Sequence, residues 1–179
     1  RSRLEDGEGA NSIIKSLYPN QLVVSKSGRY YFIPISDKIK HHDFGPNDFE
    51  MDEKGFLKYV GEKKDFKFKQ GVDVSRFQGE IDWSKVKEDG IEFAIIRAGY
   101  RGITEGKVIA DETFEDNIKG AIENGIDVGV YFYSQAINKE EALEEANSVI
   151  EMIEPYKITY PVVIDIESAD SDNARTLNL

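Results

Sequence analysis

Hydrophobic and polar positions alternate in two different ways along the chain, and the change falls near residue 70. Before it, short apolar runs such as "QLVVS", "GRYYFIPI" and "GFLKYV" are separated by turn-rich text such as "HHDFGPNDFEMDEKG". Runs of this length, bounded by Gly, Pro, Asn and Asp, are typical of short antiparallel strands. The first part of the chain therefore predicts a small β unit.

We divide this first part into three segments. Residues 1–11 are polar, and we expect them to be flexible, as chain termini often are. Residues 12–60 are assigned to the small accessory β unit. Residues 61–70, "GEKKDFKFKQ", are assigned to a linker that leads into the second part.

Residues 71–179 alternate between strand-length apolar runs and helical stripes. The runs are "GVDVS", "FAIIRAGY", "DVGVYFYS" and "PVVIDIE". The stripes between them start at good capping residues, namely Asp82, Asp111 and Asn138, the last with Glu141 three residues on. This alternation predicts βαβ units and a parallel sheet in an α/β fold. Four strands make either a small open sheet or the first part of an eight-stranded barrel, which needs about 200 residues or more.

Two acids interrupt the apolar strand "PVVIDIES". Alternation places Val162, Ile164 and Ile166 on one face, and puts Asp165 and Glu167 on the other, with Cα atoms about 6.6–6.8 Å apart. The carboxyl ends of parallel strands are where α/β folds bind ligands. Two carboxylates in such a site cannot both ionise freely, so one pKa is expected to rise, and an acid with a base is what glycosidic cleavage needs. A metal-ligand pair, a helix cap and a solvated loop start are the alternatives.

Residues on the other predicted strands could share that site. Asp73 ends the first strand, although it could equally serve as a cap or a salt-bridge partner. Arg97 lies on the second strand and could orient a carboxylate. Tyr131 and Tyr133 share one face of the third, where a tyrosine offers a sugar an apolar ring and a hydroxyl. Core packing is the alternative for these tyrosines, and it is favoured for Tyr131 taken alone.

Composition removes several function classes. The net charge of −11 disfavours nucleic acid and anionic membrane surfaces as partners, because both would repel the chain. Cysteine is absent, so a thiol nucleophile and a thiolate metal site are excluded. We expect no metal and no cofactor, and no apolar stretch reaches the roughly 18 residues of a membrane span. His41 and His42 are interpreted as a solvated pair, and Asp111 as a helix cap only.

Four segments together resemble glycoside hydrolase family 25, the Chalaropsis-type lysozymes or N-acetylmuramidases. They are "GVDVSRFQGEIDWSKVKEDGIEFAIIRAGYRG", "DETFEDNIKGAIENGIDVGVYFYSQA", "EALEEA" and "PVVIDIES", and the resemblance runs in order over about residues 69–179. It implies a modified (β/α) barrel of TIM type and hydrolysis of the β-1,4 bond between N-acetylmuramic acid and N-acetylglucosamine in peptidoglycan. It also implies a secreted, bacteriolytic enzyme at the bacterial cell surface or wall, although the chain shows no signal-like segment.

The resemblance also suggests roles for the acids. Glu167 resembles the general acid of the family. Asp165 resembles the partner that positions the 2-acetamido group of the substrate or stabilises the charged intermediate, and Asp73 resembles the acid of the first strand. The implied mechanism is retaining, with help from the substrate's own acetamido group. Tyr131 and Tyr133 match the aromatic strand of the family in type only.

The chain departs from the family pattern after the acidic strand. The family has roughly four further strands and another pocket acid, whereas the sequence stops twelve residues past Glu167. We therefore expect a truncated catalytic domain over residues 71–179, a partial barrel with an unpaired sheet edge, and self-association through that edge. The alternatives to a muramidase are a non-catalytic wall-binding fragment and a glycosidase acting on another N-acetylhexosamine polymer, such as chitin.

Overall fold

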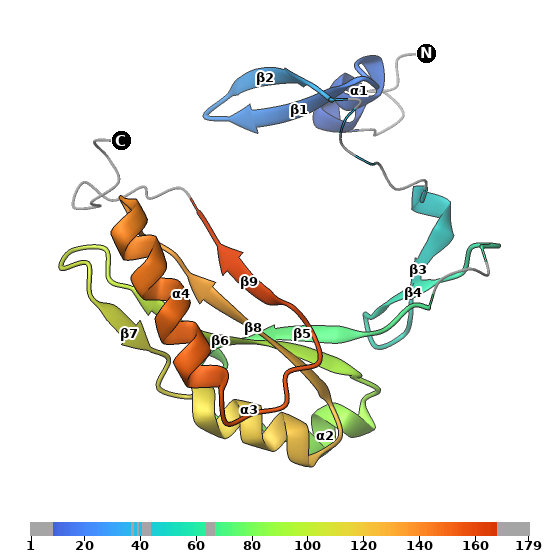
Figure 1. Ribbon diagram of the computed structural model, residues 1–179. Helices are drawn as coiled ribbons and strands as arrows, with labels where there is room; N and C mark the ends of the chain where they lie inside the picture. Colours follow the sequence, from blue (N-terminus) through green and yellow to red (C-terminus); the bar gives the residue numbers. More distant parts are fainter. Residues whose placement is uncertain (1–8, 37, 39, 41–43, 64–66, 168–179) are drawn as a thin grey trace. The chain divides into compact units, whose positions relative to one another are not determined.

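The computed structural model describes residues 9–36, 38, 40, 44–63 and 67–167 (Figure 1). The chain forms two compact units, Arg1–Phe49 and Glu50–Leu179, which we describe separately. These two units do not test the domain boundaries expected from the sequence. Those boundaries therefore stay predictions. Among the described residues, no helix has the length and apolar character needed to cross a membrane.

The first unit contains one helix and one hairpin. Strands β1 (Gln21–Lys26) and β2 (Arg29–Pro34) pair antiparallel, and Ser27 and Gly28 join them with positive φ angles of 50° and 74°. Positive φ at both central positions is what a two-residue hairpin turn requires. Helix α1 (Ala10–Leu17) precedes the hairpin and was not expected from the sequence. The apolar runs of the hairpin thus form strands as predicted. The helix before them was not predicted from the spacing of apolar residues.

The second unit opens with two short strands. Strands β3 (Phe49–Met51) and β4 (Leu57–Tyr59) form a two-stranded sheet of their own. The carboxylate of Asp52 accepts hydrogen bonds from the backbone N–H of Lys54 at 2.9 Å and of Phe56 at 2.8 Å, which closes the loop between the two strands.

The main sheet contains four parallel strands, in agreement with the sequence. Its order is β5 (Gly71–Val74), β6 (Phe93–Arg101), β8 (Asp127–Tyr133) and β9 (Val162–Asp165). A short strand, β7 (Val108–Ala110), adds to β6 in the antiparallel direction. With three residues, β7 is too short to give a period-2 pattern, and the sequence did not indicate it.

Three helices cover one side of this sheet (Figure 1). They are α2 (Trp83–Glu88), α3 (Phe114–Glu123) and α4 (Lys139–Ile153). As predicted, Asp82 and Asn138 cap α2 and α4 by accepting backbone N–H groups of their first turns. The core lies between helices and sheet, and its largest fully buried side chains are Ile96, Ile118, Val128 and Val130. This arrangement confirms the α/β class and the first strands of a (β/α) barrel.

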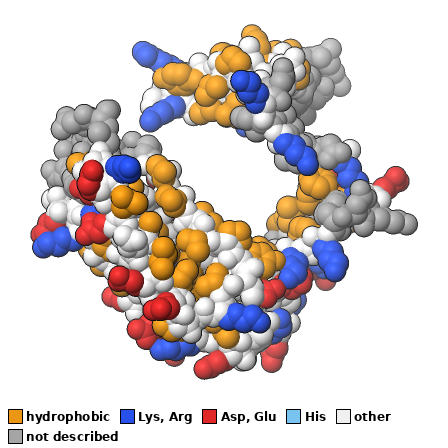
Figure 2. Space-filling view, in the orientation of Figure 1, with side chains coloured by type: hydrophobic (Ala, Val, Ile, Leu, Met, Phe, Trp, Pro, Cys, Tyr) orange, Lys and Arg blue, Asp and Glu red, His pale blue; other side chains and the backbone are white. Residues whose placement is uncertain are grey.

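Strand β9 is an edge of the sheet, because its only pairing among the described residues is with β8. Its apolar side chains are widely exposed: Val162 by 49%, Val163 by 41%, Ile164 by 66% and, just beyond the strand, Ile166 by 78%. They line a groove of about 660 Å³ with the facing residues of α4. Figure 2 shows hydrophobic side chains gathered over α4 and β9. The uncovered apolar face expected from the sequence is therefore present.

Candidate active site

A pocket of about 480 Å³ lies at the carboxyl ends of the parallel strands. Its lining comes from β6, β8, β9 and the turns beside them, and consists of Arg76, Phe77, Arg97, Tyr100, Arg101, Ile103, Tyr131, Tyr133, Asp165 and Glu167. This is the end of a parallel sheet at which ligands bind in barrels and open sheets alike. Five of the six candidate residues named from the sequence line this pocket, and Asp73 does not.

The two acids of "PVVIDIES" meet in this pocket. Asp165 is half-buried and lies opposite Tyr133 in the register between β9 and β8. The backbone N–H of Ser134 donates to the carbonyl of Asp165 at 2.8 Å and fixes the end of the strand. Glu167 is exposed, two residues further along. Ile164 and Ile166 line the groove beside α4 instead, so the acids and the isoleucines lie on different faces as predicted, although Val163 lines that groove as well.

The two tyrosines point into the same pocket from β8. Burial raises the pKa of the Tyr131 hydroxyl, the negative charge of Asp73 raises it further, and the positive charge of Arg97 acts in the opposite direction. The Tyr133 hydroxyl accepts a hydrogen bond from Nε2 of Gln135 at 3.0 Å. Asp73 is exposed and is not part of the pocket lining, but it is close enough to Tyr131 to influence that side chain.

Arg97 is held by Asp111 beneath the pocket. Nε of Arg97 donates to Oδ2 of Asp111 at 2.7 Å, and both side chains are buried. The sequence interpretation of Asp111 as a helix cap only was wrong, because α3 begins after Thr113 and the carboxylate also accepts the backbone N–H of Arg76. Arg97 does orient a carboxylate, as predicted, but the carboxylate is that of Asp111.

The environment of Asp111 keeps its carboxylate ionised. Burial alone would raise its pKa, but hydrogen bonds from Thr113, from the backbone of Arg76 and from Arg97 together lower the pKa below the ordinary value. The Thr113 hydroxyl donates to Oδ1 at 2.8 Å, so both carboxylate oxygens are occupied. The pair therefore supplies a fixed guanidinium to the floor of the pocket.

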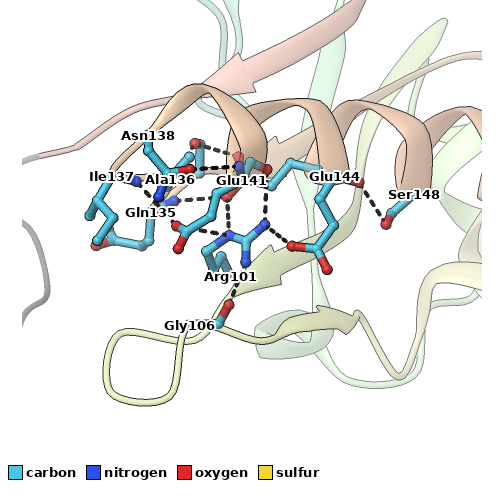
Figure 3. A network of polar contacts seen from close by, with 11 residues as sticks. Arg101, Gly106, Gln135, Ala136, Ile137, Asn138, Glu141, Glu144 and Ser148 are labelled. Atoms are coloured by element: carbon cyan, nitrogen blue, oxygen red, sulfur yellow. Dashed lines mark hydrogen bonds and ion pairs between the residues drawn. The ribbon is translucent and has the colours of Figure 1, made fainter.

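Arg101, which also lines the pocket, belongs to a second polar network, in which Arg101 and Glu145 are buried and Glu144 is exposed (Figure 3). Its Nε donates to Oε1 of Glu145 at 2.7 Å and its Nη2 donates to Oε2 of Glu144 at 2.7 Å. Further bonds reach the backbone carbonyls of Glu141 and Gly106. The network ties the first turns of α4 to the end of β6. In the sequence, this network is visible only as an arginine at a strand end and acids in "EALEEA".

No metal site emerges from these residues. In the part of the chain that the structure describes, no group of three or more His, Cys, Asp or Glu side chains is arranged to hold an ion. His41 and His42 lie outside the described residues, so the expectation that they form a solvated pair is not tested. The chemistry that the pocket can perform is proton transfer and charge stabilisation by its carboxylates.

Comparison with protein families decides the membership of the chain. The model of Glycosyl hydrolases family 25 matches residues 72–178. The chain belongs to this family. The match covers β5 to β9 and both acids of the pocket, and it confirms the resemblance that the sequence showed.

Curated relatives of the family cover the same part of the chain. The chain is 32% identical over 98 residues to the Autolytic lysozyme of Clostridium acetobutylicum, covering 55% of this chain and 28% of that protein. It is 42% identical over 66 residues to Lysozyme M1 of Streptomyces globisporus, covering 37% of this chain and 21% of that protein. The chain thus spans less than a third of the length of these two relatives.

A solved structure agrees with the fold. The modular autolysin LytC from Streptococcus pneumoniae superposes with a TM-score of 0.53 and 26% identity, over 86% of this chain and 30% of that one. The strands and helices described above therefore correspond to a partial barrel of this family. A barrel of this kind places its site at the carboxyl ends of the strands, where the pocket of this chain lies.

Proposed function

We propose that the protein is a lysozyme-type glycoside hydrolase, an N-acetylmuramidase that cleaves the β-1,4 bond between N-acetylmuramic acid and N-acetylglucosamine in peptidoglycan. The observation that carries the proposal is the meeting of Asp165 and Glu167 with Tyr131 and Tyr133 in one pocket at the carboxyl end of the sheet. Membership of glycosyl hydrolase family 25 and the lysozymes among its relatives support the same activity.

The residues take the following roles in this proposal. Glu167 protonates the oxygen of the leaving sugar, and Asp165 positions the 2-acetamido group, whose carbonyl oxygen attacks the anomeric carbon. Asp73, on the first strand of the main sheet, adds negative charge beside Tyr131. Tyr131 and Tyr133 contact the sugar. Arg97, fixed by Asp111, supports the two tyrosines from the floor of the pocket. Water then completes hydrolysis with retention of configuration.

Two substitutions test the assignment. Glu167→Gln and Asp165→Asn keep the size of each side chain and remove its charge and proton. We expect Glu167→Gln to abolish the release of reducing ends from purified peptidoglycan, because proton transfer contributes about 10²–10⁴-fold to such rates. Asp165→Asn should reduce this release about 100-fold, because a misplaced acetamido group loses about that factor in rate. Glu151→Gln, an exposed change on α4, is the matched control. Full activity of Glu167→Gln would overturn the proposal.

A wall-binding role without turnover is the second candidate. It is favoured by the position of Glu167, which lies beyond the last paired residue of an edge strand. Co-sedimentation with purified peptidoglycan, without release of reducing ends, would select this role. Release of sugar from chitin oligomers but not from peptidoglycan would instead select a glycosidase of another N-acetylhexosamine polymer.

We also propose that the exposed edge of β9 pairs with a second copy of the chain. An unpaired edge with apolar side chains is a template for strand addition, and Ile164 and Ile166 are 66% and 78% exposed. Light scattering coupled to size exclusion should give a concentration-dependent dimer that Ile164→Lys shifts to monomer. A monomer at all concentrations would contradict this proposal.

The location and the first unit follow from the same function. A muramidase of this kind acts outside the cell or at the bacterial cell wall. In this proposal residues 12–60 form an accessory unit that holds or spaces the catalytic residues 71–179 at the wall, with residues 61–70 as the linker.

A further inference from the structure

Phe77 is the most unusual side chain at the pocket. It lies in the short 3-10 turn Arg76–Gln78 that follows β5, and it lines the pocket while 74% of its surface remains exposed. Other exposed rings of the described chain are covered to a greater extent, for example Tyr31 at 49%. Ligand pockets are lined mainly by aromatic and apolar side chains, so an open ring at the mouth of this pocket offers a contact surface to a ligand.

The turn that carries Phe77 is fixed by its own hydrogen bonds. The Ser75 hydroxyl accepts the backbone N–H of Phe77 at 3.3 Å, and the Gln78 carboxamide accepts the backbone N–H of Ser75 at 2.8 Å. The backbone N–H of Arg76 donates to the buried carboxylate of Asp111 at 3.1 Å. Gly79 then ends the turn with a φ of 66°. The position of the ring is therefore set before any ligand arrives, which lowers the entropy cost of binding.

Two guanidinium groups support the ring. The Cζ atoms of Arg76 and Arg97 lie 5.2 Å and 5.1 Å from its centroid, within the range of cation–π contacts. The same two groups lie 5.5 Å and 5.3 Å from the ring of Tyr100. Arg97 is itself immobilised by Asp111. The ring is thus connected through Arg97 to the floor of the pocket, while most of its surface stays open.

We propose that Phe77 is a stacking platform for one pyranose ring of the glycan strand that enters the pocket. The apolar C–H face of a β-1,4-linked N-acetylhexosamine matches a flat, preorganised aromatic surface, and the sugar hydroxyls remain directed to solvent and to neighbouring polar groups. The platform would hold the chain of sugars beside Asp165 and Glu167, so it sets affinity and register. This inference rests on the proposed function and extends it to a binding residue.

The test measures binding without turnover. In the full chain carrying Glu167→Gln, a peptidoglycan tetrasaccharide of alternating N-acetylglucosamine and N-acetylmuramic acid is titrated by calorimetry. We expect Phe77→Ala and Phe77→Leu to weaken binding about tenfold, which corresponds to about 1.4 kcal/mol, because both variants lose the flat ring. Phe77→Trp and Phe77→Tyr should stay within about threefold of the parent. Leu143→Ala, an exposed apolar change on α4 outside the pocket, should bind like the parent.

The variants distinguish this inference from the proposed function. Equal binding by Phe77→Leu and the parent would overturn the platform, even if Glu167→Gln abolishes hydrolysis as proposed. Loss of binding in Phe77→Leu together with full hydrolysis by Glu167→Gln would uphold the platform and overturn the catalytic assignment. Absence of binding by every variant and the parent would overturn both. Near-ultraviolet circular dichroism of Phe77→Leu checks that the fold is unchanged.

Discussion

Nη2 of Arg97 lies 2.6 Å from Oδ2 of Asp111 in a buried ion pair directly beneath the candidate active site. Arg97 belongs to β6 and Asp111 to the segment between β7 and α3, so the pair joins the sheet to the start of a helix. Through the Asp111 carboxylate it also holds the turn of Phe77. One carboxylate thus organises both the floor and the mouth of the pocket.

Removing the charge of Asp111 should destabilise the protein strongly. Asp111→Asn leaves the buried guanidinium of Arg97 without its counter-charge, and breaking a buried pair in this way costs about 3–5 kcal/mol. Urea unfolding followed by circular dichroism measures the loss. The matched control is Asp82→Asn at the exposed cap of α2, where asparagine caps as well as aspartate and stability should stay close to that of the parent. Equal effects of the two variants would contradict the prediction.

The Asp111 carboxylate should make the stability of the protein depend on pH. Because the pKa of Asp111 is lowered in the folded protein, its contribution is fully present above the unfolded value of about 3.9 and is lost as the pH falls through the folded value. The difference in unfolding free energy between the parent and Asp111→Asn should therefore shrink between pH 5 and pH 2, as estimated from the ordinary range of aspartate. A difference that stays constant over this range would refute the assignment.

The buried pair of Arg101 and Glu145 should contribute more to stability than an exposed ion pair does. Glu145→Gln removes the buried charge that pairs with Arg101, and we expect a loss of about 3 kcal/mol, at the lower end for buried pairs because Glu144 remains. Glu115→Gln removes an exposed partner of Lys119 and should change stability much less, because water and salt screen exposed ion pairs. Thermal unfolding of both variants provides the comparison, and a larger loss for Glu115→Gln would argue against the network.

Gly129 of β8 should not tolerate a side chain. A Cβ atom there would lie 2.7 Å from the carbonyl oxygen of Pro161, 2.8 Å from Ile95 and 2.9 Å from Tyr160. We expect Gly129→Ala to cost about 1–3 kcal/mol, as overpacking does. Gly102→Ala, whose Cβ would meet only ordinary contacts at 3.6 Å and beyond, is the control and should be close to neutral. Comparable unfolding midpoints of the two variants would contradict this expectation.

Periodicity in the sequence was enough to predict the sheet and the two acids on one face. The period of two along "PVVIDIES" separates Asp165 and Glu167 from the isoleucines without any knowledge of their neighbours. The same holds for the caps Asp82 and Asn138, whose hydrogen bonds run to residues three positions away. These features depend on local geometry, and residues that are close together in the sequence determine local geometry.

The missed features depend on partners distant in sequence. Arg101 and Glu145 are 44 positions apart, and nothing local distinguishes this glutamate from the others in the chain. Asp111 resembled a helix cap because it precedes a helical stripe. Its main partner, however, lies 14 residues earlier on another element. Phe77 was not singled out, because an aromatic residue in a turn gives no sign of its exposure. Pairs of side chains from different elements can be predicted only when the fold is known.

The edge strand β9 also decides how firmly the proposed proton donor is held. In a parallel ladder a strand bonded on one side leaves about half of its backbone amides without a sheet partner, and such strands open at lower free energy than central ones. Asp165 is the last residue paired with β8, and Glu167 follows it. The two candidate acids therefore lie at the end of an edge strand of the sheet and not of a central one. Whatever adds to that edge would slow amide exchange along β9 and sharpen the placement of both acids at the same time.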